Sequence, residues 1–230
     1  MEIGRNIIRR QSTFLFWEFI IIVLGVLSAL AVDEWRAERE LQEQRRHVLV
    51  SLLTDLKEDR DDYRHFTDNT GVRAGAAAYL DKLASGATAD IPDQFQYAGE
   101  ALAFLVLNAR LQTTRSAIEE IGSTGGRAVI TDDQLRIRIL QYYALATDRS
   151  AVNQYVEPHQ QRLQMALERL GVSYADGAAI DVAEVLADKT IHALIRSIGQ
   201  TAEFAPVYIR RLADLNATLI NDIERILLEG

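Results

Sequence analysis

The amino-acid sequence predicts an all-α protein in which one N-terminal transmembrane helix continues into an extramembrane helical bundle. Residues 14–32 form an apolar run with one acid, and the chain that follows is rich in charge with apolar residues at helical spacing. No β-strand pattern is stronger than that of residues 128–130, so helices are expected to form the core. We therefore expect a basic N-terminus (1–13), a transmembrane helix (14–32) and a helical extramembrane domain (33–230).

The apolar run has the length of a membrane span. Its 19 residues, Phe14 to Val32, correspond to a helix of about 28 Å, and the hydrocarbon layer of a bilayer is about 30 Å thick. A cleaved secretory signal ending at Ala29-Leu30-Ala31 is the alternative interpretation. The spanning length and the acid inside the run favour a retained anchor.

One face of this helix carries a polar residue and two small ones. Glu18, Ile22, Gly25 and Ala29 recur at helical spacing, and small residues allow membrane helices to approach closely. This face therefore predicts helix contact and a homo-oligomer. The alternative is that Glu18 reaches from one turn inside the bilayer to its surface, and that the small residues have no special role.

The flanks of the run predict its orientation. Three arginines precede it, whereas the basic residues on the other side are diluted by acids. We expect the N-terminus in the cytoplasm and the C-terminal domain in the periplasm, with Trp35 as an anchor at the membrane interface. The basic residues in front of the run are Arg5, Arg9 and Arg10.

A single apolar stripe follows on the charged helix beyond the membrane. Its residues recur at sevens and fours, so they should pack on the rest of the domain or on the same helix of a neighbouring subunit. The stripe consists of Leu41, Val48, Leu52, Leu56 and Tyr63.

Two sequence patterns resemble a family of uncharacterised bacterial single-span membrane proteins. The first combines Glu18, Gly25 and Trp35 with the later acidic stretch 55–59, although residues 33–34 are Asp-Glu where the family commonly has Asn-Asn. The second comprises Glu119, Glu120, Gly125, Ile130, Leu135, Arg136, Tyr142 and Tyr143. The resemblance implies a bacterial inner-membrane protein and carries no known activity.

Breaker residues divide the domain into further helices. Residues 69–71 are expected to close the first long helix, with a second helix over 72–83 that ends at Ser85-Gly86. A third helix is expected to start at Pro92, and its apolar part, 101–107, is the predicted centre of the domain.

The second half of the chain gives clearer signals. A short helix over 113–121 should stop at the glycine-rich run 122–126, which we interpret as a turn because the strand and the lysine of a phosphate-binding loop are missing. Asp132 should begin a helix in which Pro158 causes a kink or a break near residue 157. A short helix over 181–187 and a last helix over 190–228 should follow.

The composition offers little for catalysis. There is no cysteine, the four histidines do not form paired metal-binding motifs, and we expect no cofactor or metal. With a net charge of −8 and interleaved basic residues, nucleic acid is not an expected partner.

Three functions remain after these exclusions. The first is a membrane-anchored, non-catalytic interaction or scaffold protein of the cell envelope, with the lipid bilayer, its own copies and a further protein as partners. The second is a sensor-like ligand-binding helical domain that acts through a partner. The third is an enzyme that uses scattered acids such as Glu119 and Glu120.

Overall fold

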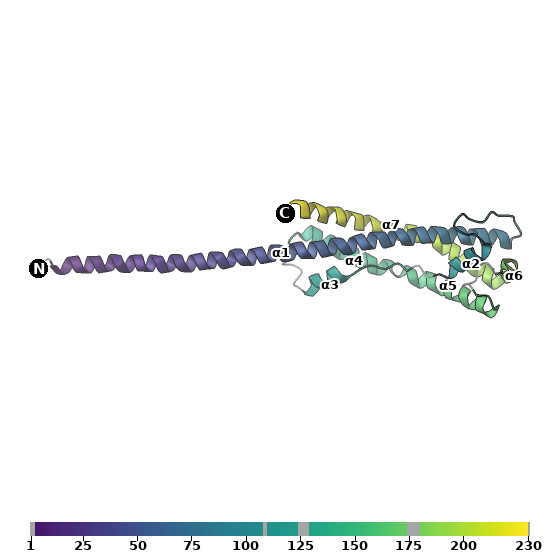
Figure 1. Cartoon of the computed structure of the whole chain (residues 1–230), viewed down its shortest axis with the longest axis horizontal. Helices are drawn as coiled ribbons and strands as arrows, with labels where there is room; N and C mark the ends of the chain where they lie inside the picture. The colour runs from purple at the N-terminus through teal and green to yellow at the C-terminus, as the bar shows by residue number, and fades with distance from the viewer. Residues whose placement is uncertain (1–2, 108–109, 124–128, 174–179, 230) are drawn as a thin grey trace.

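The described part of the chain folds into seven helices without strands, and one of the helices projects far beyond the others (Figure 1). The computed structural model describes residues 3–107, 110–123, 129–173 and 180–229, and their side chains from Phe19 onward. The all-α class predicted from the sequence is confirmed for these residues.

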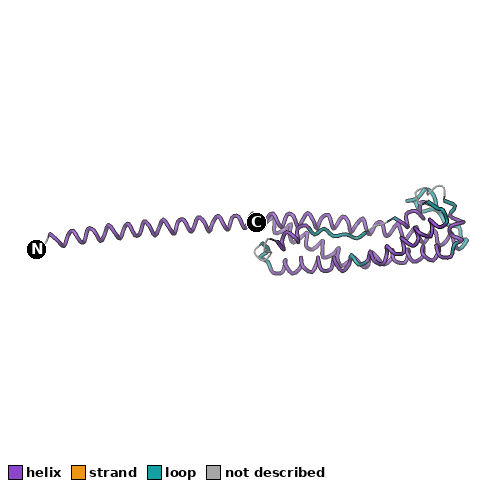
Figure 2. The backbone as a smooth tube through the Cα atoms, turned by 90° about the horizontal axis from the view of Figure 1, so that it is seen from below, coloured by secondary structure: helices purple, strands orange, loops and turns teal. Residues whose placement is uncertain are grey.

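Helix α1 (Ile3–Ala84) is a single rod of 82 residues. Its N-terminal part projects as an isolated helix, and its C-terminal part lies in the bundle (Figures 1 and 2). The predicted turn at residues 69–71 is wrong, because α1 continues through Gly71. Thr70 and Arg73 are buried on either side of it, and burial of this turn outweighs the cost of about 1 kcal/mol for a helical glycine.

The predicted end of this helix at Gly86 is confirmed. Gly86 has φ +77°, a conformation that glycine adopts easily, and its N–H donates to the carbonyl of Leu83. The next N–H, from Ala87, reaches back to the carbonyl of Lys82. These two bonds form a Schellman cap, which satisfies the last carbonyls of α1.

After α1 the chain returns along the bundle, and most of this returning stretch is not helical. Helix α2 (Ala98–Val106) begins six residues after Pro92, so the predicted helix start at Pro92 is wrong. The carbonyl of Pro92 instead accepts from the N–H of Phe95 in a turn. After α2 we define residues 107 and 110–115 as the return segment, which leads to α3 (Ser116–Ser123).

Helices α4 (Asp133–Arg149) and α5 (Val152–Arg169) form the next arm. The predicted start is confirmed, since the Asp132 carboxylate accepts from the N–H groups of Gln134 and Leu135 at 2.8 and 3.1 Å. Of the predicted kink or break near residue 157, the break is wrong. The arm breaks at residues 150–151, and Pro158 lies inside α5.

The final arm runs back along α1. Helix α6 (Val182–Ala187) begins at Asp181 as predicted, and α7 (Lys189–Glu229) follows it. Val48 shares one core with Ile223, whereas Leu80 shares a second core with Ile191, so α1 and α7 are antiparallel. Helices α4 and α5 pack against α7 from another side.

The apolar stripe packs inside the bundle rather than on a neighbouring subunit. Val48, Leu52, Leu56 and Tyr63 are almost completely buried, whereas Leu41 lies before the bundle and is 39% exposed. The first alternative for this stripe is therefore confirmed from Val48 onward.

Among the residues that the structure describes, no helix has an apolar stretch long enough to cross a bilayer. The predicted span begins at Phe14, and the side chains of residues 14–18 lie outside the described part of the chain.

Candidate functional site

The most concentrated chemistry lies inside the bundle, where two aspartates of α1 face the return segment and the start of α3. Asp55 and Asp59 are four residues apart on one face of α1, and they are 5% and 0% exposed. They lie on the same face as the apolar stripe, among Leu52, Leu56 and Tyr63. An acid on an apolar helix face is the sequence signal from which this pair could have been found.

Asp55 holds the start of α3. The Ser116 hydroxyl donates to its two carboxylate oxygens at 2.7 and 2.9 Å, and the Ala117 N–H donates to Oδ2 at 2.8 Å. An N-terminal helix turn has unpaired N–H groups, so Asp55 acts as a cap supplied by another helix.

Asp59 receives two short hydrogen bonds in a dry environment. The Thr114 N–H donates to Oδ1 at 2.6 Å, and the Tyr142 hydroxyl donates to Oδ2 at 2.5 Å. Burial raises the pKa of Asp59 to about 6, and the two hydrogen bonds only partly offset this effect. Asp59 can therefore change its charge at mildly acidic pH.

A chain of hydroxyls extends from this carboxylate. Tyr142 Oη lies 2.7 Å from Tyr63 Oη, which lies 3.0 Å from Thr113 Oγ1. Because Tyr142 donates its proton to Asp59, Tyr63 must donate to Tyr142 and accept from Thr113. Burial raises the pKa of Tyr63 to about 12 and that of Tyr142 further, so both tyrosines are neutral donors.

Helix α7 contributes Asn216 to the same place. Its Nδ2 donates to the carbonyl of Leu56 at 2.9 Å and to Tyr142 Oη at 3.3 Å, while its buried Oδ1 has no hydrogen-bond partner among the described residues. We call Asp59, Tyr63, Thr113, Tyr142 and Asn216 the buried polar network. It joins α1, α4, α7 and the return segment.

Other buried polar side chains form hydrogen bonds with the backbone of the return segment. Gln160 donates to the carbonyl of Leu107 at 2.8 Å, and Asn153 both donates to and accepts from the backbone of Leu111 at 3.0 Å. The Arg73 guanidinium also donates to the Leu107 carbonyl, at 2.7 Å, and burial lowers its pKa. A segment without helix or sheet needs such partners when it is buried.

These contacts favour a structural role for the network. Its carboxylate and hydroxyls are all committed to one another or to the backbone, and Tyr63 and Tyr142 are at most 2% exposed. A general acid or base needs a group that can donate or accept a proton within reach of a substrate atom. The geometry instead explains how one irregular segment is held inside a helical bundle.

The predicted membrane-helix contact face lies on the projecting part of α1. Ile22 is 59% exposed, and a side-chain carbon placed on Gly25 would meet no other atom within 4 Å. Ala29 is also exposed, whereas the side chain of Glu18 lies outside the described residues. Ile22, Gly25 and Ala29 therefore contact no other element in the part of the chain that the structure describes.

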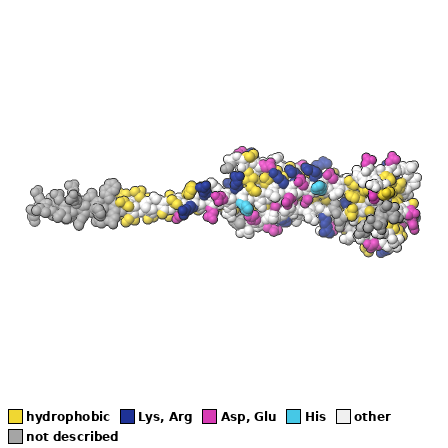
Figure 3. Space-filling model, viewed as in Figure 1, with side chains coloured by type: hydrophobic (Ala, Val, Ile, Leu, Met, Phe, Trp, Pro, Cys, Tyr) yellow, Lys and Arg dark blue, Asp and Glu magenta, His cyan; other side chains and the backbone are white. Residues whose placement is uncertain are grey.

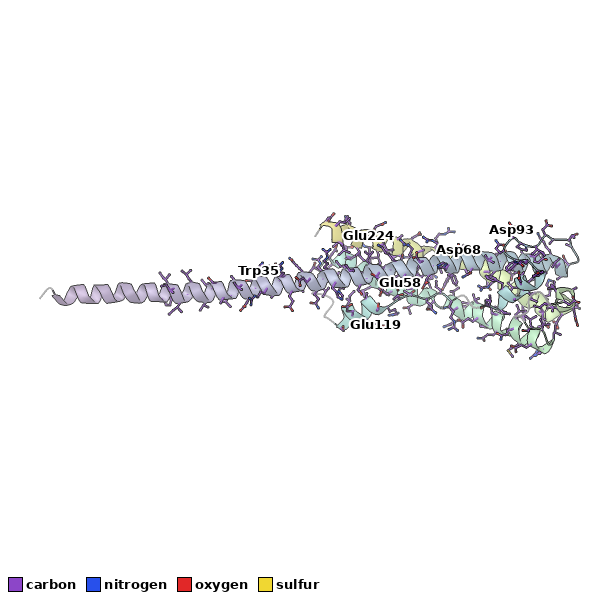
Figure 4. The ribbon with its side chains drawn as sticks, in the orientation of Figure 1. Trp35, Glu58, Asp68, Asp93, Glu119 and Glu224 are labelled. Carbon is purple, nitrogen blue, oxygen red and sulfur yellow. The ribbon has the colours of Figure 1, made fainter. Side chains whose placement is uncertain are left out.

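The predicted interfacial anchor, Trp35, lies on the same projecting rod. It is 58% exposed, and the Arg39 guanidinium lies 5.3 Å from the centre of its ring (Figure 4). An amphipathic aromatic ring beside a cation suits the boundary between lipid and water.

The residues that carry the family resemblance lie in different environments. Tyr142 belongs to the buried polar network, and Tyr143 is buried beside it with a hydroxyl that has no hydrogen-bond partner in the described part of the chain. Glu119 is exposed, and Glu120 lies 3.7 Å from His47. Leu135 is buried, Arg136 pairs with Asp133, Ile130 is buried, and Gly125 lies outside the described residues.

No cluster of metal-ligating side chains occurs in the part of the chain that the structure describes. His192 lies 2.7 Å from Asp81, and His47 is largely exposed. Comparisons with protein-family models, with curated proteins and with solved structures find no match to this chain.

Proposed function

We propose that this protein is a membrane-anchored, non-catalytic helical protein that serves as an interaction or scaffold component of a bacterial envelope. The projecting part of α1 carries the proposal. From Phe19 to Val32 it exposes nine large apolar side chains, most of them by more than half. Figure 3 shows this apolar surface on the rod, followed by charged side chains toward the bundle.

The energetic argument is the cost of leaving this surface in water. Burial of one such side chain contributes about 1.5–3 kcal/mol, so nine half-exposed side chains represent on the order of 10 kcal/mol. A lipid bilayer removes this cost without a protein partner. The charged part of α1 after Val32 then holds the bundle away from the membrane surface.

Membrane retention tests the anchor. We expect the full-length protein to stay in the membrane pellet after carbonate extraction, with residues 14–31 present in its intact mass. Replacing Leu24 and Leu27 by arginine should release it, because a charge at the centre of a span costs several kcal/mol. Replacing Phe204 and Val207 by arginine should not release the protein. These two side chains are at least as exposed as Leu24 and Leu27, but they lie on the bundle. Release of the unmodified protein would refute the anchor.

The proposed orientation places the bundle in the periplasm. A reporter that works only outside the cytoplasm should be active when it is fused after Gly230, because the arginine-rich N-terminus stays in the cytoplasm. Activity of a strictly cytoplasmic reporter at this position would reverse the orientation.

Self-association through the contact face of α1 is the second part of the proposal. Gly25 leaves open space on the rod, into which an identical helix fits closely. We expect a homo-oligomer in nanodiscs that Gly25→Leu weakens and Val26→Leu, on another face, leaves intact. A monomeric wild type, or an equal effect of the two substitutions, would contradict this assembly.

A further inference from the structure

The bundle has a groove between α1 and α7 that the proposed roles in anchoring and scaffolding do not use. Its α1 side is formed by residues 60–68, and its α7 side by residues 206–216. It has a volume of about 450 Å³ and opens to solvent, which is within the range of small-molecule sites. We call it the α1–α7 groove; its lining includes Arg60, Arg64, Arg210, Tyr63, Asp68 and Asn216.

Three arginines give one part of this groove an excess of positive charge. Arg60 and Arg64 share a single acid, Asp61, at 3.4 and 3.6 Å, and both side chains are largely exposed. Arg210 has no ion pair among the described residues. Guanidinium groups bind carboxylates through paired, planar hydrogen bonds, so this part of the groove suits a carboxylate ligand.

The groove also contains an acid on its α1 side. Asp68 is exposed (Figure 4) and has no ion pair among the described residues. A carboxylate in this position favours a ligand that carries an ammonium group in addition to its own carboxylate.

From these contacts we propose that the α1–α7 groove binds a small amino acid-like zwitterion, with its carboxylate on the arginines and its ammonium on the Asp68 side. The groove lies entirely within the bundle, so the proposal does not depend on membrane insertion. Because Tyr63 and Asn216 lie at the base of the groove, a ligand there would lie beside the buried polar network.

Two probes of the same skeleton test the charge pattern. Aspartate and succinate differ by one ammonium group, and calorimetric titration of the full-length protein in nanodiscs measures both. We expect aspartate to bind with a dissociation constant of about 1 mM or below, and succinate about tenfold more weakly. No binding of either probe up to 10-fold above that concentration, or equal binding of both, would overturn the proposal.

Neighbouring arginines of α7 provide matched variants. Arg210 lines the groove, whereas Arg211 is exposed outside it. Arg210→Gln should weaken aspartate binding about tenfold or more, and Arg211→Gln should change it less than twofold. Asp68→Asn should remove the preference for aspartate over succinate. Similar losses in the two arginine variants would show general charge attraction and refute a site in this groove.

Discussion

Protonation of Asp59 should stabilise the bundle as the pH falls from 7 to 5. The carboxyl is fully buried, and its pKa is about 6 in the folded chain against an ordinary value of 3.8. Between these values the folded chain holds a proton that the unfolded chain has released, so stability rises as pH decreases. The contribution is complete below pH 3.8 and is lost as the pH rises through 6.

The two pKa values fix the size of the effect. For one group that titrates in this way, the free energy of unfolding increases by about 1.3 kcal/mol between pH 7 and pH 5. A domain of this size shifts its Tm by about 2–4 °C per kcal/mol, which gives a rise of about 3–5 °C.

Thermal unfolding of the full-length protein in detergent, followed by circular dichroism at both pH values, measures this rise. Asp59→Asn cannot titrate, so the difference between wild type and variant isolates Asp59 from every other ionising group. We expect the variant to lose the 3–5 °C rise. An identical pH dependence in wild type and variant would refute the burial argument.

Two further pairs of variants test the buried polar network and the packing of α1 against α7. Tyr142→Phe should lower the free energy of unfolding by about 1.5–3 kcal/mol in urea titrations, because its hydroxyl donates to a buried carboxylate. Tyr143→Phe should lower it by less than about 0.5 kcal/mol or raise it, since the hydroxyl it removes has no partner; equal losses would contradict the network. Gly199→Ala should cost about 1–3 kcal/mol, as its new methyl group would lie 2.7 Å from Ala77 Cβ, whereas Gly75→Ala meets nothing and should gain about 0.5–1 kcal/mol. A gain at both glycines would show that α1 and α7 are less closely packed.

Local signals in the sequence determined the helical class and several helix ends. Asp132 and Asp181 cap helix starts, and Gly86 ends α1 with a positive φ, as their residue types predict. These features depend on a few neighbouring residues, which is why the sequence alone identified them.

The tertiary structure decided where such signals are overridden. Gly71 does not end α1 because the residues around it are buried, and Pro158 is accommodated inside α5 while the arm breaks at residues 150–151. At these positions the local preference to end the helix and the long-range packing that opposes it differ in free energy by about one to a few kcal/mol. A difference of this size cannot be predicted from a short stretch of sequence.

The buried polar network likewise depends on the folded chain. Asp59 and Tyr142 are 83 residues apart in the sequence, and nothing in their local patterns pairs them. They meet because the return segment enters the bundle without helix and requires hydrogen-bond partners for its backbone. The sequence by itself determined the helical class and the apolar rod, while only the packing of α1, α4 and α7 around that segment decided which acids are buried.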